Sequence, residues 1–183
     1  LIDLGAFGKI STIRVRKAHS GVSGKWLPAY WFDEKDAAGG AMMDLGCHPM
    51  YELAYFGGKL KRITGMFNSP LGSKVDENAV SIMEFENGII GISETGFMSY
   101  ASPEIFEIYG SEGSLIRHGD DVKFRSAKIA PYTGDWIRPA MPASVTKGRC
   151  ANQSKLFKRN SYCACAWTFA KHHIKPIIFY SRI

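Results

Sequence analysis

The chain has 183 residues, enough for one domain with a hydrophobic core but cramped for two. Apolar residues make up 45% and charged residues 22%, which is typical of a soluble globular protein, and no apolar run approaches the roughly 18 residues of a membrane helix. The net charge of +6 is unevenly spread: residues 1–135 hold 14 Lys and Arg and all 17 Asp and Glu, a net −3, whereas residues 136–183 hold 9 basic and no acidic residues, a net +9. We therefore expect a domain over residues 1–135 and an atypical basic tail over 136–183.

The first predicted element is a strand. Residues 9–18 alternate between two faces, one with Ile13 and Val15 and the other with Arg14 and Arg16, so we expect a strand with one polar, basic face. Residues 19–36 carry two glycines, a proline and several aromatic side chains, which fit neither a strand nor a helix. We interpret them as a long structured loop. Long loops in compact domains tend to be either functional or disordered, and the many aromatic residues of this one argue against disorder.

A helix is predicted over residues 39–56, closed by Gly57 and Gly58, which suit a left-handed C-terminal cap. Pro49 lies inside this helix and has no amide hydrogen to donate to the carbonyl of Leu45. We therefore expect a kink or a restart of the helix beside His48.

Asp44 and His48 are four residues apart in this predicted helix. That spacing stacks the two side chains on one face, roughly 5–6 Å apart at Cβ, so the carboxylate can orient and stabilise the imidazole. A histidine held in this way can transfer protons. The alternative is a surface Asp–His pair of an amphipathic helix, because many such pairs are structural.

The remaining elements follow a period of two, which indicates strands. Asn87-Gly88 and the turn at 110–113 are hairpin signals. One helix against six or seven strands predicts an α+β domain with a large, open and mostly antiparallel sheet. The helix covers only part of the sheet, so we expect the other face to be buried against a partner. The strands are predicted at residues 61–68, 79–86, 89–98, 104–109, 114–117 and 122–125.

Three further residues are candidates for a substrate site. His19, at the end of the basic strand, could line a site with Arg16 or Lys17, although a solvated strand end explains it equally well. Trp31, with Phe32 beside it, could wall a pocket for a sugar-like ligand, or both could be plain core aromatics.

Other motifs do not match a known kind of site. The glycines at 5–8 precede a strand and lack the GxGxxG spacing of a dinucleotide site, so we interpret them as a turn. The tail cysteines and histidines depart from zinc-ligand spacing, so no metal site is expected; they are Cys163, Cys165, His172 and His173. Cys47, the lone cysteine before the tail, indicates a reduced core thiol and hence a cytoplasmic protein.

Taken together, the segments GKISTIRVRKAHSG, AGGAMMDLGCHPM and YGSEGSL, with the Asn87-Gly88 turn, resemble the C-terminal domain of the glucose-fructose oxidoreductase and myo-inositol dehydrogenase family, Gfo/Idh/MocA. The resemblance covers residues 1–130 approximately. It implies an α+β domain whose open sheet forms homodimers or tetramers and whose first helix faces the nicotinamide. It also implies a second, Rossmann-type domain that binds NAD or NADP.

The resemblance assigns roles to the helix residues. Asp44 and His48 match the catalytic Asp and His of the family, with His48 as the proton acceptor or donor for a sugar, polyol or related substrate. Tyr51 stands where many members have a second aspartate. The Rossmann domain and its catalytic lysine lie on sequence that this chain does not contain, so we expect a fragment that binds no dinucleotide by itself.

The tail departs from the family pattern, and we hypothesise that residues 136–183 are read in a shifted frame or are otherwise not native sequence. Two rival functions remain open. The first is a non-catalytic binding or assembly module with the same fold. The second is a nucleic-acid binder that uses the basic, aromatic tail, although the function that we favour involves neither nucleic acid nor membrane.

Overall fold

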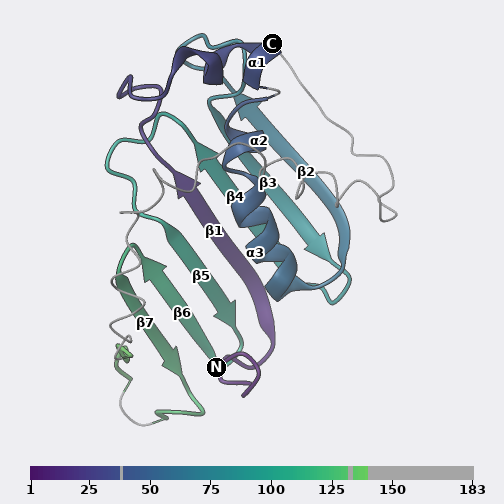
Figure 1. The fold of residues 1–183 in the computed structure, drawn as a ribbon. Coiled ribbons are helices and arrows are strands. Elements are labelled where there is room, and N and C mark those ends of the chain that lie inside the picture. Colours follow the sequence, from purple (N-terminus) through teal and green to yellow (C-terminus); the bar gives the residue numbers. More distant parts are fainter. Residues whose placement is uncertain (38, 132–133, 140–183) are drawn as a thin grey trace.

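A computed structural model describes residues 1–37, 39–131 and 134–139. It contains one seven-stranded sheet with helices on one side (Figure 1). The elements in chain order are β1 Ile10–Ala18, the 3-10 helix η1 Ala29–Phe32, α1 Glu34–Ala37, α2 Ala41–Asp44, α3 Cys47–Gly57, β2 Leu60–Asn68, β3 Asn78–Phe85, β4 Ile90–Gly96, β5 Ile105–Gly110, β6 Gly113–His118 and β7 Asp121–Ser126. None of the helices in these ranges is long and apolar enough to cross a membrane.

The strand order is β2-β3-β4-β1-β5-β6-β7. Strand β1 pairs in parallel with β4 and antiparallel with β5, and the other four pairings are antiparallel. The sheet therefore consists of two three-stranded meanders, β2-β3-β4 and β5-β6-β7, which β1 joins along the middle.

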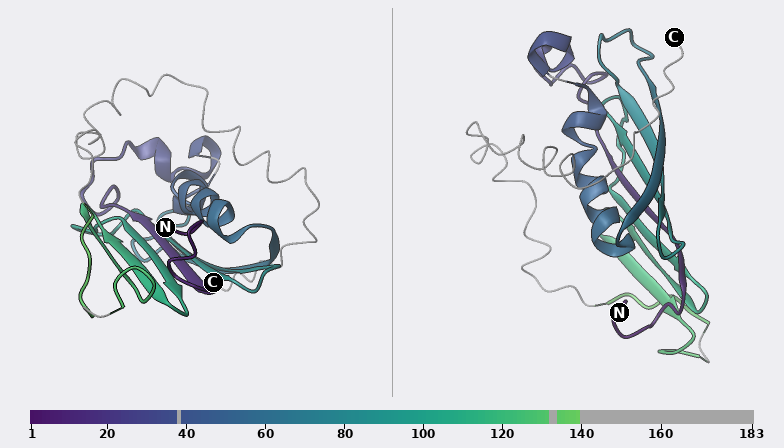
Figure 2. Two further views of the ribbon diagram at one scale, coloured as in Figure 1. Left: turned by 90° about the horizontal axis from the view of Figure 1, so that it is seen from below. Right: turned by 90° about the vertical axis from the view of Figure 1, so that its right-hand side faces the viewer.

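Helix α3 covers the centre of one face of this sheet, as the right-hand view of Figure 2 shows. Its side toward the strands carries Pro49, Leu53 and Gly57, which are buried at intervals of four residues and so lie on one stripe of the helix. At Gly57 the ring of Phe85 comes within 2.5 Å of the place where a Cβ atom would stand, so only glycine lets the helix lie this close to the sheet. The core between the helix and the sheet includes Ile13, Val15, Met83, Phe85 and Ile108.

No described helix covers the opposite face of the sheet, which we call the open face (Figure 2). The strand register places one side chain from each strand on it in rows across the sheet, because directly paired residues point to the same side. The row Ile82, Ile92, Arg14 and Glu107 shows the division of this face: it is apolar on the β3-β4 side and charged around β1 and β5.

The structure confirms the predicted α+β class and its strands. Each predicted strand appears with its ends shifted by two residues at most, and Gly88 has the positive φ of +86° that the first hairpin turn needs. The predicted loop after β1 also contains the short helices η1 and α1, which sequence periodicity missed because each spans only four residues.

The expected tail lies almost wholly outside the described residues. This includes the tail cysteines and histidines weighed as metal ligands, and the hypothesis of a shifted frame is untested. Residues 136–139 are described, and there Ile137 forms an isolated antiparallel bridge with Phe124 of β7. Ile137 thus contacts β7, and the division of the chain at Asp135 stays a prediction.

Candidate functional site

The predicted helix over 39–56 is interrupted, as the proline predicts. Helix α2 ends at Asp44 and α3 begins at Cys47, with Leu45 and Gly46 between them. Without an amide hydrogen on Pro49, the Leu45 carbonyl accepts instead from the backbone N–H of His48 at 3.1 Å. The restart of the helix places Asp44 and His48 on either side of the break.

Asp44 and His48 are close enough to interact electrostatically across this break. Burial raises the pKa of the Asp44 carboxyl above its usual value, and the positive charge of a protonated His48 partly offsets this rise. Asp44 is half-buried, and within the described residues its carboxylate has neither a hydrogen bond nor an ion pair. Its backbone carbonyl accepts a hydrogen bond from the thiol of Cys47 at 3.2 Å.

A structural carboxylate that loses water in a fold is ordinarily compensated by hydrogen bonds or a partner charge. Within the described residues, the charged partner of Asp44 is His48, whose side chain is exposed. The pair therefore presents an uncommitted acid and base at the surface of the helix layer, which is an arrangement suited to proton transfer with a bound hydroxyl group.

The outer side of α3 continues this surface. Tyr51 and Tyr55, three and seven residues after His48, are 64% and 73% exposed. They lie on the side of the helix opposite Leu53, and their rings offer apolar area with a polar hydroxyl at the tip. An exposed row of His48, Tyr51 and Tyr55 is thus available to a ligand or to another domain.

His19 lies just past the end of β1, at the same end of the sheet as α2 (Figure 1). Its ring stacks on Phe97 with centroids 5.2 Å apart and contacts Trp26 at 4.7 Å. Burial lowers the pKa of His19, and its Nδ1 accepts the backbone N–H of Gly21 at 3.1 Å, which favours the neutral ring. Trp31, in η1, stacks against Tyr30 at 5.7 Å. A substrate role for His19 and Trp31 stays a prediction.

Arg16 is not brought to this site. Its side chain lies on the open face, away from α2 and α3, where its guanidinium donates to Glu94 at 3.0 Å, Ser99 at 2.8 Å and Ser102 at 3.0 Å. The strand alternation explains the placement, because Arg16 and His19 are an odd number of residues apart and so point to opposite sides. The structure thus places Arg16 on the face opposite α2 and α3, and a substrate role for Arg16 stays a prediction.

Sequence reasoning missed Asp76, which precedes β3. Its carboxylate accepts the backbone N–H of Gly40 at 3.1 Å and of Met42 at 2.8 Å, and its backbone carbonyl accepts the N–H of Ala41 at 2.8 Å. The glycine at position 40 permits this contact, since a Cβ there would come within 2.0 Å of the Asp76 carbonyl oxygen. Asp76 is 36 residues away from Gly40 in the sequence, so no local pattern indicates this contact.

The described residues offer no cradle of the dinucleotide type at the N-terminal glycines. Gly5 and Gly8 have positive φ and form a turn that leads into β1, with the intervening Ala6 and Phe7 buried in the core. A dinucleotide fingerprint instead needs a glycine loop at the start of a helix. No group of three or more His, Cys, Asp or Glu side chains that could hold a metal ion occurs within residues 1–37, 39–131 and 134–139.

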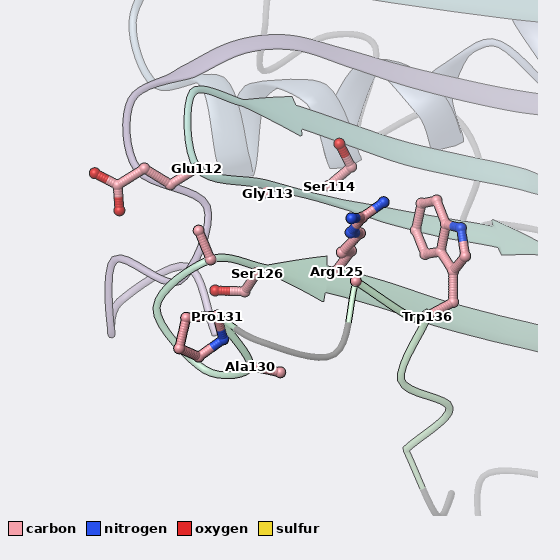
Figure 3. Close-up of a pocket in the computed structure, with 10 residues that line it drawn as sticks. Glu112, Gly113, Ser114, Arg125, Ser126, Ala130, Pro131 and Trp136 are labelled. Carbon is pink, nitrogen blue, oxygen red and sulfur yellow. The ribbon is translucent and has the colours of Figure 1, made fainter.

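A separate pocket of about 320 Å³ lies at the β6-β7 edge of the sheet (Figure 3). Ser114, Arg125 and Trp136 line it, and the Arg125 and Trp136 side chains extend from neighbouring segments on the same side. None of the predicted site residues contributes to this pocket.

Solved structures of oxidoreductases share this fold. Levoglucosan dehydrogenase in complex with NADH has a TM-score of 0.67 at 22% identity, over 78% of this chain and 42% of that one. An inositol dehydrogenase homolog complexed with NAD+ from Azotobacter vinelandii has a TM-score of 0.63 at 19% identity, over 78% and 40% of the two chains. An NAD binding oxidoreductase from Klebsiella pneumoniae has a TM-score of 0.66 at 18% identity, over 75% and 40%.

The chain thus spans about two fifths of the length of these proteins. No curated protein matches the sequence. The family model for the GFO/IDH/MocA C-terminal domain matches residues 1–116, which is more than half of the chain and contains β1 to β5, both helices of the Asp44–His48 site and most of β6. The chain belongs to the GFO/IDH/MocA family and carries its C-terminal domain.

Proposed function

We propose that this chain is the substrate-facing part of a NAD- or NADP-dependent oxidoreductase that acts on a sugar, a polyol or a related small molecule. The observation that carries the proposal is the half-buried Asp44 carboxylate, which has no hydrogen bond within the described residues and is next to the exposed His48. Family membership and the sugar-derived and inositol-related names of the structural neighbours support this substrate class.

In this proposal the residues of the chain handle the proton. His48 accepts the proton of a substrate hydroxyl, and Asp44 stabilises the imidazolium that forms or binds a second hydroxyl. Tyr51, one helical turn beyond His48, offers a hydroxyl and an aromatic face where a sugar ring can lie. His19 and Trp31 would border the same end of the site.

The nicotinamide, held by a domain outside this chain, would accept the hydride. The turn at residues 5–8 leads into a strand, so we assign it no role in binding the dinucleotide. The exposed row of His48, Tyr51 and Tyr55 is the surface on which such a domain would close over the substrate.

The test is turnover after the chain is joined to a family Rossmann domain, with polyols and aldoses and with both cofactors. We expect His48→Ala to lower kcat by about 10²- to 10⁴-fold, the usual contribution of a positioned acid or base. His118→Ala is the matched control, because His118 projects from β6 on the open face and pairs with Glu107, so its loss should leave kcat unchanged.

The rival function, a non-catalytic module of the same fold, predicts a different result. The joined protein would then bind a polyol without turnover, and His48→Ala would change neither property. Loss of turnover in His48→Ala with unchanged thermal stability is the result that separates the two.

We further propose that the open face associates with a second copy of the chain. Exposed apolar side chains gather there on β2, β3 and β4: Met66 is 80% exposed, Val80 44%, Ile82 49% and Ile90 44%. A monomer rarely leaves such a contiguous patch in water, and a twofold pairing of two patches would bury it.

The Cys47 thiol, which donates to a backbone carbonyl, supports a reduced, cytoplasmic setting.

A further inference from the structure

Helix α2 is a single four-residue turn, too short to be stable by itself. Its N-cap residue, Gly40, has no side chain to cap the first amide groups. The last residue of this turn is Asp44, whose backbone N–H donates to the carbonyl of Gly40 at 3.1 Å. Whatever fixes Gly40 therefore also fixes the position of Asp44.

Asp76 fixes Gly40 and the two residues after it through three hydrogen bonds. Two run from the N–H groups of Gly40 and Met42 to the two carboxylate oxygens, at 3.1 and 2.8 Å, and the third runs from the N–H of Ala41 to the Asp76 backbone carbonyl, at 2.8 Å. The carboxylate thus acts as a capping residue supplied from another part of the chain. Its negative charge also lies at the positive end of the turn, where it is stabilising.

The segment that carries Asp76 is itself held rigidly by the next residue. Glu77 is fully buried, and its carboxylate accepts the N–H of Leu71 at 2.8 Å and both the N–H and the hydroxyl of Ser73, at 3.0 and 2.5 Å. Its backbone carbonyl accepts the N–H of Phe97 at 2.8 Å. Neighbouring residues in extended chain point to opposite sides, so Glu77 fastens the β2-β3 loop while Asp76 reaches α2.

We propose that Asp76 is a positioning residue of the Asp44–His48 site, which holds α2 against the start of β3 and so fixes the Asp44 carboxylate beside His48. That this site is catalytic rests on the proposed function, whereas the contact of Asp76 with α2 does not. The contact itself can be tested without turnover, so a failure of one proposal is distinguishable from a failure of the other.

The experiment uses NMR on the full 183-residue chain with two variants of Asp76. In Asp76→Ala, hydrogen exchange of the Met42 amide should be faster by about fivefold, the factor that corresponds to the loss of a typical helix cap. Asp76→Asn keeps one oxygen acceptor and should show a smaller increase. Asp121→Ala, which removes an exposed carboxylate paired with Arg138, is the control and should leave this amide unchanged.

A second readout follows the side chain of Asp44. The pKa of this carboxyl is raised by burial, so release of α2 should move it down toward its usual value. Removing the Asp76 charge acts in the same direction, and Asp76→Asn removes that charge together with one of the two side-chain hydrogen bonds. A larger fall in the Asp44 pKa for Asp76→Ala than for Asp76→Asn is the expected result, because only the alanine variant removes every side-chain hydrogen bond.

Gly40→Ala tests the same contact from the other side and serves if Asp76→Ala does not fold. Its Cβ would come within 2.0 Å of the Asp76 carbonyl oxygen, so it should push α2 away and produce the same local changes. The proposal is overturned if the Asp44 titration and the Met42 exchange are unchanged in these variants. A lower melting temperature with an unchanged Asp44 titration also overturns it, since that describes a purely stabilising residue.

Discussion

Leu53 joins the helix that carries His48 to the sheet, and its truncation is a quantitative test of this packing. The side chain is fully buried, and its Cδ2 atom lies 3.2 Å from the place where a Cβ of Gly91 would stand. Leu53→Ala removes three carbons, worth about 2.4 kcal/mol in transfer free energy at ~0.8 kcal/mol each. Gly91 has no side chain that could move into the space, so a cavity term brings the expected loss of unfolding free energy to roughly 3–4 kcal/mol.

The measurement is urea unfolding followed by circular dichroism. With an m-value of about 1–3 kcal/mol/M, the midpoint should fall by roughly 1–4 M while the slope stays constant. Tyr55→Ala, on the outer side of the same helix and 73% exposed, should change the unfolding free energy by no more than about 0.5 kcal/mol. A loss below about 1.5 kcal/mol for Leu53→Ala would refute the tight contact of α3 with the sheet.

Three further predictions concern the site, the open face and the helix end. Asp44→Asn should stabilise the chain at neutral pH, because it removes a charge that burial disfavours. The pKa of Asp44 is higher in the folded than in the unfolded state, so protonation of this carboxyl stabilises the fold. That stabilisation is fully present below about pH 3.9 and is lost as the pH rises through the folded pKa. Urea midpoints near pH 3 and pH 7 test this, and an equal difference at both would contradict it. Ile82→Lys should weaken self-association at least tenfold in sedimentation equilibrium if two open faces meet there, and leave it unchanged if they do not. Gly57→Ala should cost about 1–3 kcal/mol by overpacking against Phe85, and a neutral result in urea unfolding would show that the ring can move.

Local patterns in the sequence predicted most of the elements. The alternation of Ile13 and Val15 with Arg14 and Arg16 identified β1 and both of its faces, because one face is buried and the other is charged. Pro49 predicted the helix break, since a missing amide hydrogen has a local consequence. Gly58, with φ of +85°, ends α3 and donates its N–H to Ala54, as the glycine pair indicated.

Long-range pairings could not be predicted in this way. The parallel pairing of β1 with β4 joins residues nearly 80 positions apart, such as Thr12 and Ile90, and no local signal encodes it. In the sequence, Asp76 is a single polar residue before a predicted strand. The fold shows that its carboxylate caps α2. For Arg16, the alternation of β1 predicts the face on which the structure places its guanidinium, beside Glu94.

The charges at the centre of the open face form a network whose groups are mostly withdrawn from water. Arg14 contacts Glu94 at 2.8 Å and Glu107 at 3.4 Å, and Arg16 contacts Glu94 at 3.0 Å. Burial would raise the pKa of Glu94, but hydrogen bonds from the two arginines outweigh this and lower it. The ion pairs therefore remain in place at neutral pH and separate the apolar patch from β5, β6 and β7.

The central position of β1 has a consequence for synthesis on the ribosome. Both neighbours of this strand, β4 and β5, are made after it, and β4 is complete only at Gly96, 78 residues after Ala18. At about 5–20 residues per second, β1 waits roughly 4–16 s with both edges unpaired. Arg14, Arg16 and Lys17 within it discourage pairing with other nascent chains during that interval. The same basic residues that form ion pairs in the finished sheet thus protect its first strand while the rest of the sheet is still being translated.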